Sequence, residues 1–344
     1  MSYSFEKVYI DGDWLLYLIA AICEDNYIEV QDSEGGEVTE YKNITTFKQV
    51  LTERGDPYNK DDYIIESKKR LKPGDVKMKG IFSLQGKIKS IQKESKAKKV
   101  VIALGGKSNF RDRLPLPVKY KGNRDNIQKP LMINMLKSWI DNNYEVEYAD
   151  DQEADDIISI NQYLGSKDQK TIVCTLDKDS RSIPGYLYNP GTKEILDIKG
   201  LGSHCIKQKS KKKTLYGEGR IWEYIQWIAG DAVDNYHPQD LLNKNLIAAK
   251  RSNLIIPSRK MSVVKIYEET KNFTTDKEWL QYCHDLFYSW YKDLEWYYTW
   301  DDVLIENATY LDMFQAYVDV VHMRRWDNDR VIIKDVLKNF DIIK

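Results

Sequence analysis

The chain has 344 residues, of which 42% are hydrophobic and 31% are charged, and its formal net charge is −1 at pH 7. These values predict a globular protein with one large domain or two smaller ones. They argue against a membrane protein, because no apolar stretch approaches the roughly 20 residues of a bilayer span, and we expect no signal peptide. The near-zero charge does not argue against a nucleic-acid partner, because the distribution of charge decides binding.

Strand-like and helical patterns alternate from the N-terminus onward. An apolar run at residues 8–10 is followed by an acidic turn at 11–13 and by a helical pattern at 14–24. Gly35-Gly36 separates two short strand-like runs and predicts a hairpin. Residues 42–75 look polar and irregular, with short helical pieces.

The alternation continues to about residue 240. Further strands are predicted at 100–104, 145–148, 171–176, 187–188 and 194–198, and further helices at 77–98, 131–142, 157–164 and 221–229. This pattern predicts an α/β fold with a central, mostly parallel sheet flanked by helices. We expect a catalytic domain at 1–240 and a helical, aromatic-rich region at 241–344. The four cysteines show no CxxC spacing, which argues against a disulfide framework and fits a cytoplasmic protein.

Acidic residues gather in four clusters at the ends of predicted strands or helices. The clusters are Asp11 and Asp13; Glu153, Asp155 and Asp156; Asp177 and Asp179; and Asp231 and Asp234. Crowded carboxylates repel one another, so clusters that converge need a hard cation to hold them together. Oxygen ligands of this kind suit Mg²⁺ or Mn²⁺. The sequence therefore predicts a site for two ions, roughly 4 Å apart, that assists displacement at phosphorus.

A single acidic cluster also allows other interpretations. One cluster alone is ordinary surface charge or a helix cap. The run that begins at Asp177 departs from a calcium-binding EF-hand loop, with Ser182 at its sixth position and Tyr188 at its twelfth. Asp11-Gly12-Asp13 also suits an aspartyl-phosphate phosphatase, an alternative that the motif alone leaves open.

Basic residues gather in the connection that follows the strand at 100–104. They are Lys107, Arg111, Arg113, Lys119, Lys121 and Arg124, with Tyr120 among them. Cationic and aromatic side chains together suit a phosphate backbone with unpaired bases. A solvated loop is the alternative. Beside a metal site, the same cations would hold a scissile phosphate.

Five stretches together resemble the 5′→3′ exonuclease and flap endonuclease family of PIN-like nucleases, in particular its bacteriophage members. The stretches are VYIDGDWLLY (8–17), SNFR…YKGNRD (108–125), EADDIIS (153–159), TIVCTLDKDSRSIP (171–184) and IAGDAVDN (228–235). The resemblance implies a two-metal nuclease that cuts DNA near a 5′ end, a nick or a flap, with an RNA–DNA hybrid as a further candidate substrate. It also implies a role in phage DNA replication or degradation, in the cytoplasm of an infected bacterial host.

The resemblance also assigns roles to residues. It implies that the first metal is held by Asp11, Glu153, Asp155 and Asp156, and that the second is shaped by Asp177, Asp179, Asp231 and Asp234. Asp13 is counted with the metal-binding acids in a supporting role, because only some relatives have it. Lys121 and Arg124 would act in catalysis on the scissile phosphate. The nucleic-acid-binding set would be Lys107, Arg111, Arg113, Tyr120, Lys121 and Arg124, with a base stacked on Tyr120.

Three features depart from the family pattern. Gly105-Gly106 stands where relatives commonly have an aspartate, which motivates an alternative function as a catalytically weakened protein that binds branched DNA. Residues 236–238 lack the Gly-x-Gly of the duplex-gripping hairpin, so K⁺ is not predicted. The basic connection is short and broken by prolines, so a closed arch is not predicted. An RNase-like relative with the same sheet is a third alternative.

The C-terminal region lies outside the resemblance. Its aromatic residues include Trp279, Phe287, Tyr291, Trp300 and Tyr317 at partly helical spacing. Core packing in a helical region is the expected role of such residues. The alternative is a stacking surface for single-stranded DNA or for a partner protein.

Overall fold

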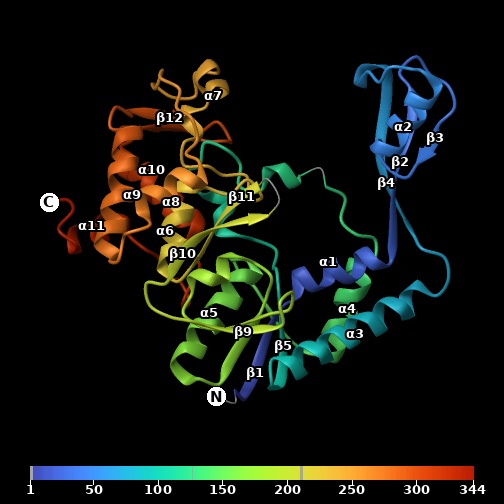
Figure 1. Ribbon diagram of the computed structural model, residues 1–344, viewed down its shortest axis with the longest axis horizontal. Coiled ribbons are helices and arrows are strands. Elements are labelled where there is room, and N and C mark those ends of the chain that lie inside the picture. Colours follow the sequence, from blue (N-terminus) through green and yellow to red (C-terminus); the bar gives the residue numbers. More distant parts are fainter. Residues whose placement is uncertain (1–2, 126, 210–211) are drawn as a thin grey trace. The chain divides into compact units, whose positions relative to one another are not determined.

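The computed structural model describes residues 3–344 except 126 and 210–211, together with the backbone but not the side chains of 209 and 212 (Figure 1). The chain forms two compact units. The first unit comprises Met1–Gly12, Ile91–Ile127 and Glu145–Lys344, and the second comprises Asp13–Ser90 and Gln128–Tyr144. The predicted boundary at residue 240 falls inside the first unit. No helix among the described residues is both long and apolar enough to span a bilayer.

A six-stranded sheet forms the centre of the first unit and confirms the predicted fold class. Its strand order is β6-β5-β1-β7-β8-β9, and every neighbouring pair is parallel except β8 with β9. The strands are β1 (Phe5–Asp11), β5 (Ala97–Leu104), β6 (Glu145–Tyr148), β7 (Thr171–Cys174), β8 (Gly185–Asn189) and β9 (Glu194–Ile198). All four residues of β7 are buried, as expected for a parallel strand covered on both faces.

Helix α5 (Ala154–Asp168) packs on this sheet. Ile157 and Ile158 form a core cluster with Val173 of β7 and Leu187 of β8. The helix begins with a capping box, in which Glu153 and Asp156 satisfy each other's backbone amides. The two acids are therefore held at the N-terminus of α5, where the helix dipole favours negative charge.

The C-terminal part of the first unit is mainly helical. Helices α9 and α10 pack against each other and against α6 (Figure 1). The side chains of Trp279, Phe287, Tyr291 and Tyr317 are fully buried. The expected core packing is thus confirmed for these aromatic residues. The elements are β10 (Ser203–Lys209), β11 (Lys212–Glu218), α6 (Arg220–Ala229), η5 (Asp240–Leu242), α7 (Lys244–Ala248), α8 (Val263–Thr270), α9 (Asp276–Tyr291), β12 (Trp296–Tyr298), β13 (Leu304–Glu306), α10 (Tyr310–Val321) and α11 (Ile333–Asn339).

The aromatic core contains residues from both sides of position 240 in the sequence. It also contains Leu116 and Tyr120 from the basic connection and Ile225 from α6. One hydrophobic cluster therefore joins the predicted catalytic domain to the predicted C-terminal region. Three short 3₁₀ helices complete the first unit: η2 (Phe110–Arg113), η3 (Gly122–Arg124) and η4 (Asp179–Ser182).

The second unit contains a small antiparallel sheet with its own core. The strands are ordered β3-β2-β4, and Ile28, Val30, Phe47 and Leu51 pack between this sheet and α2. The predicted hairpin across Gly35-Gly36 is confirmed by the pairing of β2 with β3. The elements are β2 (Glu24–Asp32), β3 (Thr39–Tyr41), α2 (Ile44–Arg54), η1 (Lys60–Asp62) and β4 (Tyr63–Leu71).

The same unit contains α1 (Gly12–Ile22) from its second residue, most of α3 (Val76–Glu94) and α4 (Ile133–Asn143). Glu24 is buried and connects these parts, because its carboxylate accepts hydrogen bonds from the Lys69 side chain at 2.9 Å and the Leu131 backbone amide at 2.8 Å. The helices predicted at 77–98 and 131–142 are confirmed with shifted ends. The irregular structure expected at 42–75 is wrong, because β4 and α2 occupy most of it.

Candidate metal centre

The centre lies at the carboxyl ends of β1 and β7. Within the sheet, β5 and β6 lie on one side of β1, whereas β7 and β8 lie on the other side. The strand order therefore reverses between β1 and β7. Ligand sites of open α/β sheets occupy such a switch point. Asp11 ends β1 and is 5% exposed, and its Oδ2 accepts a hydrogen bond of 2.9 Å from Thr175 Oγ1, just after β7.

Thr175 also begins the turn that presents the next two acids. Its hydroxyl oxygen accepts the Asp177 amide at 3.0 Å, and Asp177 Oδ1 accepts the Asp179 amide at 2.7 Å. The turn leads directly into η4, which begins at Asp179. Gln226 of α6 donates to the Asp179 carboxylate. The DKD sequence is therefore folded into a tight turn that directs carboxylates toward α6.

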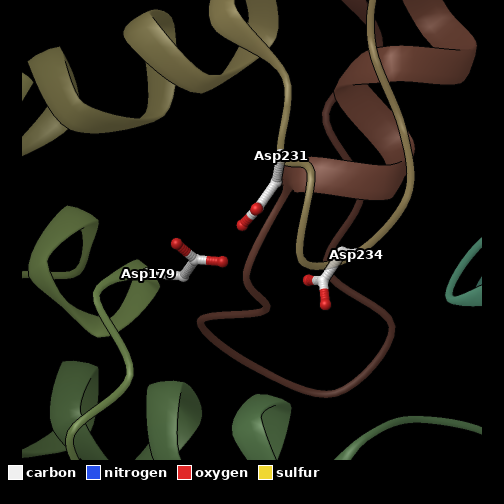
Figure 2. Close-up of side chains that lie close together, drawn as sticks. All are labelled: Asp179, Asp231 and Asp234. Carbon is white, nitrogen blue, oxygen red and sulfur yellow. The ribbon is translucent and has the colours of Figure 1, made fainter. Parts of the chain in front are cut away.

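Asp231 and Asp234 reach the same place from the end of α6. Gly230 ends this helix with φ of 66°, a conformation that favours glycine. Two backbone hydrogen bonds between Asp231 and Tyr236 then close the loop. Carboxylate oxygens of Asp179, Asp231 and Asp234 lie within 4.8 Å of one another. Asp179 and Asp231 point their carboxylates toward each other, with Asp234 alongside (Figure 2).

The remaining acids, after β1 and at the start of α5, influence one another and the first group through their charges. Burial, and then the charges of Asp177, Asp11 and Glu153, raise the pKa of Asp155 well above its usual range. Burial and the charge of Asp177 raise the pKa of Asp179 to about 8. Asp177 thus acts on both groups. Such shifts are typical of functional carboxylate clusters.

Three cationic side chains lie among these carboxylates. Lys121 Nζ is 2.5 Å from Glu153 and 3.9 Å from Asp234, and Arg124 Nη2 is 2.6 Å from Asp234. Lys178 Nζ is 2.7 Å from Asp231. Burial alone would lower the pKa of Lys121, but Glu153 and Asp234 outweigh it and raise the pKa. The cations offset part of the negative charge and remain ammonium or guanidinium groups.

The loop that carries Lys121 is hydrogen-bonded to the loop that carries Asp234. The Lys121 amide donates to the Asp234 carbonyl oxygen at 2.8 Å, and Asn235 Nδ2 donates to the Lys119 carbonyl oxygen at 2.9 Å. Asn123 Nδ2 donates to the Ala232 carbonyl oxygen at 3.1 Å. Hydrogen bonds to backbone carbonyl oxygens therefore hold the basic connection against the acidic loop. The position of Lys121 near the carboxylates does not depend only on attraction between charged side chains.

The structure corrects the expected roles of Asp156 and Arg111. Both side chains are buried, and Arg111 donates to the two oxygens of Asp156 at 2.6 and 3.0 Å. Those oxygens also accept the backbone amides of Glu153 and Arg324. Arg111 donates further to the carbonyl oxygens of Val320 and His322, at 3.0 and 2.8 Å. We therefore remove Asp156 from the metal ligands and Arg111 from the phosphate contacts.

Tyr120 is also placed differently from the expectation. Its ring is 5% exposed and belongs to the aromatic core, so it offers no free face to a base. Its hydroxyl donates to Glu153 at 3.0 Å. Lys107 and Arg113 are exposed, and Arg113 pairs with Asp151 at 2.6 Å. Asp13 lies in the first turn of α1 and belongs to the second unit.

The residues that remain suit a hard divalent cation. The donors are carboxylate oxygens, the ligands that Mg²⁺ and Mn²⁺ prefer. A cation would also remove the repulsion that raises the pKa values of Asp155 and Asp179. The candidate ligands are Asp11, Glu153, Asp155, Asp177, Asp179, Asp231 and Asp234.

Sequence reasoning missed several residues that organise the centre. Thr175 and Gln226 act through hydrogen bonds to Asp11 and Asp179, and their types carry no signal at this spacing. The sequence could have indicated Lys178, because this residue stands between the predicted ligands Asp177 and Asp179. An alternating acid–base–acid run after a buried strand indicates a cation held inside the carboxylate cluster.

Comparisons with known proteins find similar solved structures at low sequence identity. No protein-family model and no curated protein matches the sequence. A mutant of T5 5′-exonuclease matches with 12% identity and a TM-score of 0.43 over 98% of each chain. Bacteriophage T5 flap endonuclease, in a pseudo-enzyme–product complex with DNA and metal ions, has 14% identity and a TM-score of 0.41 over 98% of this chain and 99% of the other. T5 5′-exonuclease with bound divalent zinc has 13% identity and a TM-score of 0.40 over 98% of each.

Proposed function

We propose that this protein is a divalent-metal-dependent nuclease that hydrolyses phosphodiesters of DNA near 5′ ends, nicks or flaps. One observation carries the nuclease proposal: carboxylate oxygens of Asp179, Asp231 and Asp234 lie within 4.8 Å of one another, and Lys121 and Arg124 lie within 4.0 Å of Asp234. Carboxylates to hold cations, next to cations that attract a phosphate, form a site for phosphoryl chemistry. The 5′ polarity, an RNA–DNA hybrid as further substrate, and a role in phage DNA replication rest on the motif resemblance.

The residues divide the work of the reaction. Asp11, Glu153, Asp155 and Asp177 would hold one ion, and Asp179, Asp231 and Asp234 would hold the other together with Asp177. Bound ions of this kind activate water and stabilise the leaving 3′ oxygen. Lys121 and Arg124 would offset charge on the phosphoryl oxygens. Both already lie within 4.0 Å of acids of the centre, so a phosphate there would exchange one anionic partner for another.

The test separates cutting from binding. Asp177→Asn is expected to abolish cleavage of a 5′-labelled nicked duplex in Mg²⁺ or Mn²⁺ while leaving DNA binding largely intact, because it removes a ligand without adding bulk. Asp285→Asn is the matched control, because Asp285 lies on the exposed side of α9 with 61% of its side chain accessible. Equal loss of cutting and binding by Asp177→Asn would contradict the proposal. A panel of blunt, nicked, flapped and RNA-primed duplexes then identifies the substrate.

A second candidate function is binding of branched DNA without cleavage. Gly105-Gly106 motivates it, because the resemblance leads us to expect an aspartate just after β5, and at Gly106 a Cβ atom would lie 1.8 Å from the Ala149 carbonyl oxygen. Tight binding of flapped DNA by the wild-type protein, with no short products in either metal, would support this candidate. Products that require metal would rule it out.

A further inference from the structure

Trp300 is an exposed aromatic residue beside the basic loop of the metal centre. It lies in the turn between β12 and β13 and is 37% exposed, whereas the adjacent Tyr297 is 1% exposed. Its backbone amide donates to the Leu116 carbonyl oxygen at 2.9 Å. Tyr297 donates from its hydroxyl to the Pro115 carbonyl oxygen at 2.8 Å. The turn is thus fixed to the chain segment that leads to Lys121.

A cation accompanies the ring. Lys119 Nζ lies 5.4 Å from the centroid of the Trp300 ring. Lys119 also pairs with Asp125 at 2.6 Å, but both side chains are about half exposed, so the pair is weak and can be exchanged for a phosphate. Lys119 precedes Lys121 by two residues, so their α-carbons are at most about 7 Å apart.

The acids that follow Trp300 have other partners. Asp301 accepts a hydrogen bond of 2.6 Å from Thr299 Oγ1, and Asp302 pairs with Arg251. Arg251 also donates to the Thr299 carbonyl oxygen and lies 5.3 Å from the Tyr298 ring. The turn is therefore ordered by its own polar contacts, and the Trp300 ring is not needed to complete them.

We propose that Trp300 stacks an unpaired base of a nucleic-acid strand whose phosphate is bound by Lys119, beside the loop that carries Lys121. The inference rests on the proposed function and adds a subsite to it. An aromatic face next to a row of cations is the arrangement that binds single strands. The buried Tyr120 cannot fill this role, and Trp300 presents an exposed ring beside the same loop.

Fluorescence anisotropy in EDTA tests the subsite without cleavage. The probes are a labelled blunt duplex and the same duplex with a single-stranded 5′ tail. Trp300→Ala is expected to weaken binding of the tailed duplex by about 5- to 150-fold, the loss of one stacked base, and to leave the blunt duplex unchanged. Trp300→Phe should recover part of the affinity. Trp326→Ala is the control, because Trp326 is 48% exposed and contacts Tyr163 rather than the basic loop.

A photocrosslink gives a second readout that does not depend on a variant. A tail that contains 5-iodouracil should crosslink the wild-type protein within the peptide that contains Trp300. A crosslink confined to other peptides, or equal affinities of wild type and Trp300→Ala for the tailed duplex, would overturn the subsite alone. Failure of the wild-type protein to bind either DNA would overturn the proposed function, and the subsite with it.

Discussion

Arg111 and Asp156 form a buried ion pair with two hydrogen bonds, at 2.6 and 3.0 Å, at the N-terminus of α5. The pair lies beside the candidate centre, because Arg111 Nη1 is also 3.7 Å from Glu153. Burial alone would lower the pKa of Arg111, but the charge of Asp156 outweighs burial and raises this pKa. Burial alone would raise the pKa of Asp156, but Arg111 holds it below its usual range. Both groups are therefore charged across the working pH range.

Arg111→Met is expected to lower the free energy of unfolding by about 3–5 kcal/mol, because it leaves the Asp156 carboxylate buried without its partner. Arg113→Met, only two residues away, removes an exposed pair with Asp151 and should change the free energy of unfolding far less, because solvent screens exposed pairs. Urea unfolding of the two variants measures the difference. Similar losses would show that Arg111 carries no structural charge pair.

His322 predicts a dependence of stability on pH. Burial would lower its pKa, but Glu223 at 2.8 Å and Asp329 at 3.1 Å raise it to about 9. Because the folded-state pKa exceeds the unfolded value of about 6.5, the contribution of His322 to stability is complete below about pH 6.5 and is lost as pH rises through about 9.

The difference in unfolding free energy between wild type and His322→Gln should therefore shrink by about 3 kcal/mol between about pH 6.5 and about pH 9. Using the difference cancels other groups that titrate in this window, including Asp179. A difference that stays constant with pH would mean that His322 is not protonated in the folded protein.

Mg²⁺ should stabilise the protein against unfolding through the carboxylate centre. Binding to the folded state alone contributes about 2.7 kcal/mol at a concentration 100 times Kd. Asp179→Asn should reduce this gain and, without metal, leave stability equal or higher, because burial and the charge of Asp177 already disfavour ionisation of Asp179. Thermal unfolding with EDTA and with Mg²⁺ measures both effects, with Asp285→Asn as control. A full Mg²⁺ response in Asp179→Asn would remove Asp179 from the ligand set.

Gly106→Ala should destabilise the protein by more than about 2 kcal/mol, because a Cβ atom there meets the backbone of Ala149 rather than a movable side chain. Gly86→Ala is the matched control. Gly86 lies inside α3 with no atom within 4 Å of the added Cβ, and alanine there should stabilise the helix by about 0.5–1 kcal/mol. Chemical unfolding measures the stability of both variants. An unchanged free energy of unfolding for Gly106→Ala would show that the segment after β5 and the segment around Ala149 can move apart.

The sequence predicted the features that depend on local pattern. Apolar runs located β1, β5 and β7, and the acids after β1 and β7 fell at the sheet edge because parallel strands share one carboxyl end. It failed at β4, where Lys68, Lys69 and Arg70 disguise a strand whose partner, β2, lies about forty residues earlier. A polar strand in a small sheet has too weak an alternation to be recognised alone.

The failures within the site have a different origin. Arg111, Tyr120 and Asp156 stand in motifs that suit DNA or metal, and only contacts from distant residues decide their burial. For Arg111 and Asp156 these contacts come from Val320, His322 and Arg324, and for Tyr120 from the aromatic core. Residue type and spacing define what a side chain can do, but long-range packing decides whether it faces solvent.

Arg111 donates hydrogen bonds to the carbonyl oxygens of Val320 and His322. These contacts have a consequence for truncation experiments. A protein shortened ahead of α10 would lose these acceptors and also part of the hydrophobic cluster around Tyr120, including Phe314 and Tyr317. An inactive deletion would then report a misassembled α5 N-terminus rather than a missing DNA contact. Point substitutions at the surface, rather than shortened chains, are the way to assign roles to the last hundred residues.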